Sequence, residues 1–140
     1  MEDYPQVKDP DLIGSYPGVV YSGGGLVWDE VLEYRVWCHP QAGAADEEDG
    51  SDYYYAFANY AEALNFSKAN KGTEEPLALI LQKEYIAEPE AGNYIHMKKE
   101  RITEWPVIFL KRPRRNAATI PNFLSPDAPD NRLDILRGNV

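Results

Sequence analysis

Apolar and polar residues alternate most regularly between positions 32 and 38, which read L-E-Y-R-V-W-C. A period of two places alternate side chains on opposite faces of a strand, so the pattern predicts a strand with one buried face and one solvated face. The β-branched and aromatic residues within it agree with this prediction. Pro40 ends the pattern, because proline cannot donate a backbone hydrogen bond to a neighbouring strand.

A second stretch of strand-forming residues, Tyr53 to Ala58, leads directly into the signals of a helix. Asn59 followed by Glu62 has the spacing of a capping box, in which each side chain accepts a hydrogen bond from a free backbone amide. Apolar residues then recur at helical spacing, so a helix is predicted over 59–70. Gly72 is expected to stop it in a left-handed conformation.

The run Leu77 to Leu81 is uninterrupted apolar sequence. Both faces of such a strand must be covered, so this strand is predicted to lie in the centre of the sheet. The following residues, Gln82 to Ile86, are expected to carry it to an exposed end.

The rest of the C-terminal half is predicted from composition and shorter patterns. It comprises a turn over 87–93, a long and more polar strand over 94–105, a short strand over 107–110, an extended anchor over 120–124 and a terminal helical turn over 131–137.

Together these segments predict one α+β domain over residues 1–140, with a mainly antiparallel sheet of five or six strands and one principal helix packed on one face. A chain of 140 residues suits a single domain with its own core. Three segments are expected outside the regular structure: a Pro/Gly-rich N-terminal segment (1–25), an acidic loop (41–52) and an extended C-terminal tail (113–140) that ends in a short helix.

Charge narrows the range of partners. The net charge of −9 disfavours nucleic acid, because a negatively charged surface repels phosphate backbones. However, seven of the 14 Lys and Arg residues lie between Lys98 and Arg115. This cluster is either a solvated face or a patch for an anionic ligand, with Arg101, Lys111 and Arg112 as candidate binding residues.

Cys38 is the single cysteine, so no intrachain disulfide forms and a reducing, cytoplasmic location is expected. Met1 is followed by acidic residues rather than by a signal peptide, and no apolar run approaches the ~20 residues of a membrane span. His39 and His96 lack ligand spacing, so neither a metal nor a cofactor is predicted. The expected partner is a small molecule or a protein, and a homo-oligomer is left open.

Two carboxylates are candidates for acid–base chemistry. Glu100 and Glu104 lie four apart in an expected strand and would share a face, where they could act as general acid and base. The alternative is a solvated strand face that also carries basic residues. Tyr55 and Trp105 are candidates for lining a ligand pocket beside Glu104, with core packing as the alternative for Trp105.

Three segments resemble a family of small bacterial proteins whose members often carry a GNAT-type acetyltransferase label. They read Y-Y-Y-A-F-A-N-Y-A-E-A-L-N-F-S, T-E-E-P-L-A-L-I-L-Q-K-E-Y-I and R-I-T-E-W-P-V-I-F-L. The resemblance covers most of Tyr16 to Leu124 and implies acetyl-CoA as a cofactor. That superfamily binds the pyrophosphate of acetyl-CoA with a Q/R-x-x-G-x-G/A loop, and neither Gln82 nor Arg101 is followed by such glycines.

A second resemblance is to small ADP-ribosyltransferase-fold proteins, in which a strand such as Tyr53 to Ala58 leads into a helix with a face like that of Ala63 to Phe66. The resemblance implies NAD binding by a His or Arg, a Tyr or Ser, and a Glu on separate strands. His39, Tyr55 and Glu104 stand in this order.

Three functions follow from the sequence. The leading interpretation is a small binding or interaction domain, because no catalytic motif is complete. The alternatives are an ADP-ribosyltransferase-fold transferase that handles NAD and a divergent GNAT-type acetyltransferase that uses acetyl-CoA.

Overall fold

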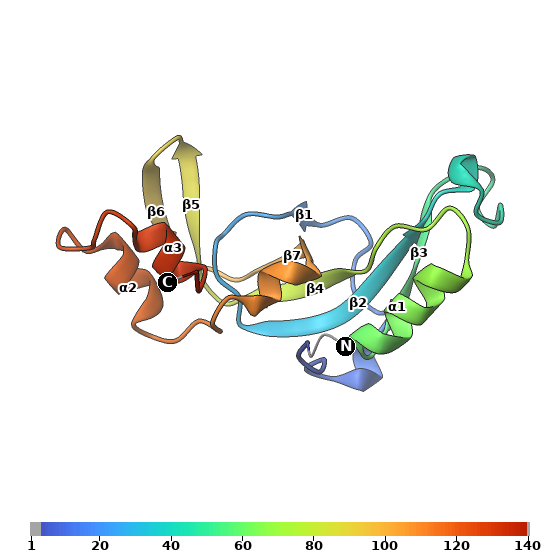
Figure 1. The fold of residues 1–140 in the computed structure, drawn as a ribbon, viewed down its shortest axis with the longest axis horizontal. Coiled ribbons are helices and arrows are strands. Elements are labelled where there is room, and N and C mark those ends of the chain that lie inside the picture. The colour runs from blue at the N-terminus through green and yellow to red at the C-terminus, as the bar shows by residue number, and fades with distance from the viewer. Residues whose placement is uncertain (1–3, 140) are drawn as a thin grey trace.

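The computed structural model describes residues 4–139, which form a five-stranded sheet, a two-stranded hairpin and three α-helices (Figure 1). Only the β1–β7 pair of the large sheet is parallel, and the other pairs are antiparallel. The predicted α+β class, with a mainly antiparallel sheet, is confirmed. The strand order is β1 (Tyr21–Ser22), β7 (Arg101–Pro106), β4 (Leu77–Gln82), β2 (Glu30–Cys38) and β3 (Tyr53–Phe57).

The apolar strand β4 lies in the centre of this sheet, as its sequence predicts. It pairs with β2 on one side and with β7 on the other. Leu79 and Ile80 point to opposite faces, and both are fully buried. Burial of each side chain contributes about 1.5–3 kcal/mol, so β4 holds the two layers of the domain together.

The principal helix α1 (Tyr60–Ala69) covers one face of β2 and β3. The predicted cap is present, because Asn59 Oδ1 accepts a hydrogen bond from the backbone amide of Glu62 at 2.9 Å. The helix has the predicted span, with Asn59 and Asn70 as its capping residues. Gly72 has a left-handed φ of +71°, but it lies three residues beyond Ala69 and turns the chain towards β4.

The opposite face of β2 is buried as well, so the predicted solvated face is wrong. Glu33 and Arg35 have no exposed surface. A β-bulge between Val31 and Glu33 shifts the register, and the N-terminal segment around 14–18 crosses this face of the sheet. The cover comes from a distant, irregular segment that follows the 3-10 turn η1 (Pro10–Leu12), so strand periodicity gives no sign of it.

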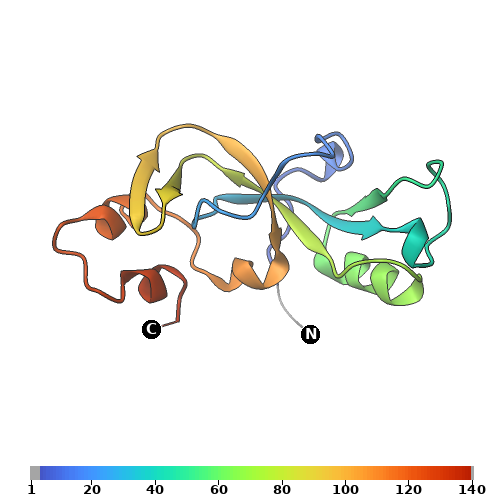
Figure 2. The same ribbon diagram turned by 90° about the horizontal axis from the view of Figure 1, so that it is seen from above.

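The C-terminal lobe is built from the hairpin of β5 (Tyr85–Glu90) and β6 (Asn93–Met97) together with α2 (Thr119–Leu124) and α3 (Arg132–Leu136). It lies at the far end of an elongated molecule from α1 (Figures 1 and 2). Its own small core contains Val27, Tyr85, Ile86, Ile120 and Phe123.

Several predictions for this half are wrong. The segment 82–86 is not an exposed strand end, because β4 stops at the buried Gln82 and β5 begins with buried residues. The expected turn 87–93 is mostly strand, with Ala91-Gly92 as the only turn residues between β5 and β6. The expected long strand 94–105 is two strands, β6 and β7, which belong to different sheets.

Two short apolar segments that were predicted to be extended are helical. Residues 107–110 belong to the 3-10 helix η3 (Val107–Lys111), and 120–124 belong to α2. Pro121 lies in the first turn of α2, where backbone amides have no partner within the helix, so it does not prevent helix formation. Residues 113–139 of the predicted tail therefore belong to the folded C-terminal lobe, and the predicted terminal helix is present as α3.

Candidate functional site

Glu104 does not lie in an open site but in a buried group of charges, which we call the Arg35 cluster and define as Glu33, Arg35 and Glu104. Arg35 Nε donates to Glu33 Oε2 at 2.7 Å, and Arg35 Nη1 donates to Glu104 Oε2 at 3.0 Å. Trp37 Nε1 donates to the same oxygen of Glu104 at 2.9 Å. The side chain of Glu104 is 13% exposed, whereas those of the other two members are fully buried.

The N-terminal segment completes the Arg35 cluster. Arg35 donates to the backbone carbonyls of Pro17 and Gly18 at 2.5 and 3.2 Å, and Gly14 N donates to Glu33 Oε1 at 2.8 Å. The ring of Tyr54 stacks on the guanidinium with its centroid 4.4 Å away. Every nitrogen of Arg35 therefore has an acceptor, and the arrangement is that of a closed structural network rather than of a reacting site.

Glu100 and Glu104 were predicted to share a strand face, and this prediction is wrong. Glu100 precedes β7 and is exposed, whereas Glu104 points into the Arg35 cluster. A general acid and base must both reach one reacting group, and these two carboxylates lie in separate environments.

His39 and Tyr55 lie at the end of β2 and β3, near the acidic loop and the short η2 helix (Pro40–Ala42). The ring of His39 bridges Asp52 and Glu74 at 2.9 and 2.7 Å, and these hydrogen bonds, with that of Asp52 the stronger influence, raise its pKa. Tyr55 donates to Glu47 at 2.5 Å, which raises the pKa of the phenol to about 12.

The three residues that resemble an NAD-binding set do not converge. Tyr55 packs its ring against Phe66 of α1, on one face of the sheet. Glu104 lies on the opposite face, together with Trp37 and Tyr54.

Trp105, the neighbour of Glu104 in the strand, is buried in the core on the α1 side. Tyr55, Trp105 and Glu104 consequently do not border a common pocket.

The single thiol and the potential metal ligands of residues 4–139 do not form a site. Cys38 is buried, as predicted, and burial raises the pKa of its thiol, which keeps it protonated and unreactive. Within residues 4–139, no three His, Cys, Asp or Glu side chains are grouped so as to hold a metal ion. Over the same residues, no helix has the length and apolar character of a membrane span.

Arg101 lies in a cleft of about 680 Å³ between the glycine run 23–25 and the β5–β6 hairpin. Its guanidinium stands 4.1 and 5.0 Å from the ring centroids of Tyr85 and Tyr21. The three glycines all have positive φ. The carbonyl of Gly24 accepts hydrogen bonds from Gln82 and Trp105. The carbonyl oxygens of Gly23, Gly24 and Gly25 therefore accept hydrogen bonds from donors of the protein itself.

Arg112 and Trp105, both candidates from the sequence, meet beside η3. The guanidinium carbon of Arg112 lies 5.0 Å from the ring centroid of Trp105 and 4.3 Å from that of Phe109. Its Nη1 donates to the carbonyl of Leu26 at 3.3 Å. Aromatic faces attract cations, so this stacking fixes the guanidinium in place.

Arg112 faces a basic cleft of about 480 Å³. We define the basic cleft by its lining residues, which are Ile108, Phe109, Lys111, Arg112, Arg137 and Asn139. Arg137 Nε is buried and has no hydrogen-bond partner. The pKa of Arg112 is lowered, first by burial and then by the positive charge of Arg137. Two cations thus stand within electrostatic reach of each other in a partly dry cleft.

Of the side chains that the structure describes, no acidic one lines the basic cleft. Among residues 4–139, neither Arg112 nor Arg137 forms an ion pair. Their neighbour Arg115 differs, because it pairs with the buried Asp29 through two contacts of 2.8 Å. Two members of the predicted basic cluster therefore differ: Arg115 is held by a buried carboxylate, whereas Arg112 faces the basic cleft.

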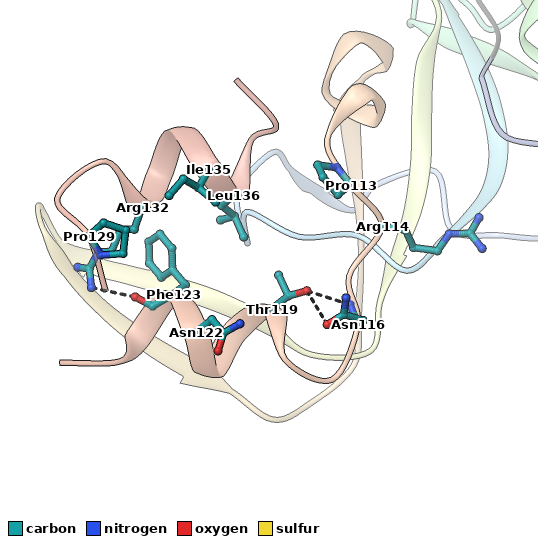
Figure 3. A pocket seen from close by; sticks show the side chains of 10 residues that line it. All are labelled: Pro113, Arg114, Asn116, Thr119, Asn122, Phe123, Pro129, Arg132, Ile135 and Leu136. Carbon is teal, nitrogen blue, oxygen red and sulfur yellow. Dashed lines mark hydrogen bonds between the residues drawn. The ribbon is translucent and has the colours of Figure 1, made fainter. Parts of the chain in front are cut away.

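A third cavity, of about 250 Å³, lies between α2 and α3 (Figure 3). We call it the α2–α3 pocket. Its lining combines apolar side chains with a small number of polar ones, and comprises Pro113, Arg114, Asn116, Thr119, Asn122, Phe123, Pro129, Arg132, Ile135 and Leu136.

Sequence reasoning missed Arg137 and the whole α2–α3 pocket. The terminal segment was predicted to contain a helical turn, but nothing in its pattern indicates which surface that turn packs on. The available signal was the spacing of Leu133 and Leu136, which places two apolar residues on one side of a short helix.

Comparisons with known proteins identify no relative: no protein-family model, no curated protein and no solved structure matches this chain. The function is therefore argued from the geometry alone.

Proposed function

We propose that this protein is a small binding domain whose ligand is a compact polyanion, held in the basic cleft. The observation that carries the proposal is the imbalance of charge at Arg112 and Arg137: both line the cleft, and within residues 4–139 neither forms an ion pair and no carboxylate lines the cleft. Burying a charge is unfavourable unless the charge is paired, and an anion from solution would supply the missing partner.

The donor geometry favours a phosphate-like group. Arginine presents a planar set of N–H donors that matches phosphate and carboxylate oxygens, often through two parallel bonds. Arg112 is held by its stacking on Trp105 and Phe109, so its orientation is fixed before a ligand arrives. Arg137 contributes a buried Nε that has no other partner. Each charged hydrogen bond is worth about 1.5–3 kcal/mol.

The charge of the rest of the chain limits the size of the ligand. The net charge of −9 repels an extended polyanion such as nucleic acid, whereas a small anion can be held within the local field of the cleft. As far as the structure describes it, from residue 4 to residue 139, the lining contains no carboxylate, imidazole or thiol. These features support binding rather than turnover as the role of the site.

Calorimetric titration with inorganic pyrophosphate, at constant ionic strength maintained with chloride, tests this proposal. Saturable binding is expected for the wild type and for Lys68→Gln, which removes one exposed positive charge from α1 at the other end of the molecule. Arg137→Gln is expected to weaken binding at least about tenfold. The proposal is wrong if the wild type releases no heat, or if Arg137→Gln binds as well as Lys68→Gln.

Thermal unfolding provides a second readout. A ligand at 100 times its dissociation constant should raise the free energy of unfolding by about 2.7 kcal/mol. The same panel with NAD and with acetyl-CoA tests the two transferase alternatives. Stabilisation by either cofactor that survives Arg137→Gln would favour a transferase site elsewhere in the molecule over the basic cleft.

A further inference from the structure

The α2–α3 pocket has the features of a site for an organic molecule with an apolar body. Its wall is formed by Phe123 of α2 and by Ile135 and Leu136 of α3, with two prolines at the rim (Figure 3). Phe123 is buried, whereas Ile135 keeps 47% of its surface exposed. A half-exposed Ile beside a hollow loses contact with water when a ligand enters, which favours an apolar ligand.

One fixed cation stands at the edge of this pocket. The guanidinium carbon of Arg132 lies 4.7 Å from the ring centroid of Phe123 and 5.3 Å from that of Tyr94. Its Nη1 donates to the carbonyl of Phe123 at 2.9 Å, which closes the link between α3 and α2. A guanidinium has five N–H donors, so most of its capacity remains after this bond.

No acidic residue lines the pocket to neutralise that cation. Across residues 4–139, Arg132 forms no ion pair. The other lining arginine, Arg114, stacks on Trp28 with its guanidinium carbon 4.9 Å from the ring centroid, and Figure 3 shows it directed away from the helices. Arg132 is thus the cation that a bound molecule would meet.

These two properties define the chemistry of the ligand. A neutral apolar molecule would fill the pocket but leave Arg132 without a carboxylate, and a bare inorganic anion would leave the wall of Phe123 and Leu136 uncovered. A volume of about 250 Å³ is slightly smaller than the ~300 Å³ at which pockets for drug-sized ligands begin. We infer that the α2–α3 pocket binds a small aromatic or branched aliphatic monocarboxylate, with its carboxylate on Arg132 and its apolar body against Phe123.

This site is separate from the basic cleft. The two share no lining residue, and the basic cleft faces Arg112 and Arg137 rather than Arg132. The inference therefore does not depend on the proposed polyanion site, and each can fail without the other.

Ligand titrations followed by backbone amide NMR would test the inference. The probes are phenylacetate, its neutral analogue phenylacetamide, and acetate, which has a carboxylate but no apolar body. We expect phenylacetate to shift amides of residues 113–123 and 132–137 in a saturable manner. Phenylacetamide and acetate are each expected to bind at least about tenfold more weakly, because each lacks one half of the recognition.

Three variants locate the binding. Arg132→Gln should weaken phenylacetate binding at least about tenfold. Ile135→Glu, at a half-exposed position that tolerates a polar side chain, should weaken it comparably by placing a negative charge at the rim. Arg137→Gln should leave it unchanged, because Arg137 does not line this pocket.

Equal affinity for phenylacetate and phenylacetamide would overturn the inference, since it would show an apolar hollow without carboxylate recognition. Equal affinity for phenylacetate and acetate would also overturn it, since it would show carboxylate recognition without a contribution from the apolar wall. Saturable shifts confined to the basic cleft, or binding unaffected by both Arg132→Gln and Ile135→Glu, would also overturn it, as would the absence of shifts at millimolar phenylacetate.

Discussion

The Arg35 cluster and the basic cleft both hold arginine side chains partly or fully away from water, and they differ in how the charge is balanced. In the Arg35 cluster, one guanidinium lies between two carboxylates, and each of its nitrogens has an acceptor within 3.2 Å. In the basic cleft, two guanidinium groups approach each other and one of them has a buried Nε without a partner, and no carboxylate of residues 4–139 lines the space.

The difference provides a way to distinguish a buried arginine that stabilises the fold from one that is available to bind a ligand, even when no relative is known. A complete set of partners makes a buried arginine part of the architecture, because removal of either sign leaves the other uncompensated. An incomplete set leaves interaction energy that only a molecule from solution can recover. Burial alone does not make this distinction, since both regions exclude much of the solvent.

The largest expected effect belongs to the Arg35 cluster. Arg35→Met should lower the free energy of unfolding by about 3–5 kcal/mol, because it leaves Glu33 and Glu104 without their buried cation. Urea denaturation measures this loss, with Lys68→Met as an exposed control expected within about 0.5 kcal/mol of the wild type. A loss below about 1 kcal/mol would show that the cluster is hydrated in solution rather than closed.

A somewhat smaller effect is expected at Leu79, which lies between Glu33 and Glu104 in neighbouring strands. Leu79→Ala should cost about 2–5 kcal/mol, because it removes buried contacts and leaves a cavity beside the carboxylates. The measurement is again urea denaturation. A negligible cost would contradict the central, doubly covered position of β4 on which the description of the fold depends.

In the basic cleft, removal of an arginine should not lower the free energy of unfolding when no ligand is present. Arg137→Gln removes a like charge near Arg112, so the free energy of unfolding in dilute chloride buffer should stay within about 0.5 kcal/mol of the wild-type value or rise slightly. Urea denaturation of the variant and the wild type in that buffer measures the difference. A loss of several kcal/mol would place Arg137 in the same structural class as Arg35.

The smallest effect concerns His39, whose ionic contacts are half-exposed and therefore screened by solvent. Its pKa is raised by Asp52 and Glu74, so the bridge stabilises the fold fully below the unfolded pKa of about 6.5, and that stability is lost as pH rises through the folded-state pKa. The unfolding midpoint of His39→Gln should be slightly lower than that of the wild type at pH 5.5 and equal to it at pH 9. A difference that grows with pH would contradict this linkage.

Local signals in the sequence predicted the centre of the fold well. The cap at Asn59 and the apolar run of β4 depend on neighbouring residues only, and both were predicted correctly. The break of the expected strand 94–105 was missed, because residues 98–100 contain neither glycine nor proline and the chain changes sheet there through tertiary pairing. The α2 segment was predicted as an extended anchor, because its six residues are too few to show a helical period.

The candidate sites were harder to predict, because they depend on contacts between distant segments. The alternating pattern around Glu33 and Arg35 resembles that of any half-solvated strand, and only the crossing of residues 14–18 buries it. Lys111 and Arg112 were identified from their cluster in the sequence. Arg137, which follows them by 25 positions or more, became part of the same cleft through the packing of α3.

The most direct test of the charge-balance argument is an NMR titration that observes the Nε–Hε groups of Arg35 and Arg137 in one sample. Arg35 Nε is bonded to Glu33, whereas Arg137 Nε has no partner. The account predicts that inorganic pyrophosphate shifts the Arg137 resonance in a saturable manner and leaves that of Arg35 unchanged. An Arg137 resonance that stays in place, or one that moves together with the Arg35 resonance, would contradict it.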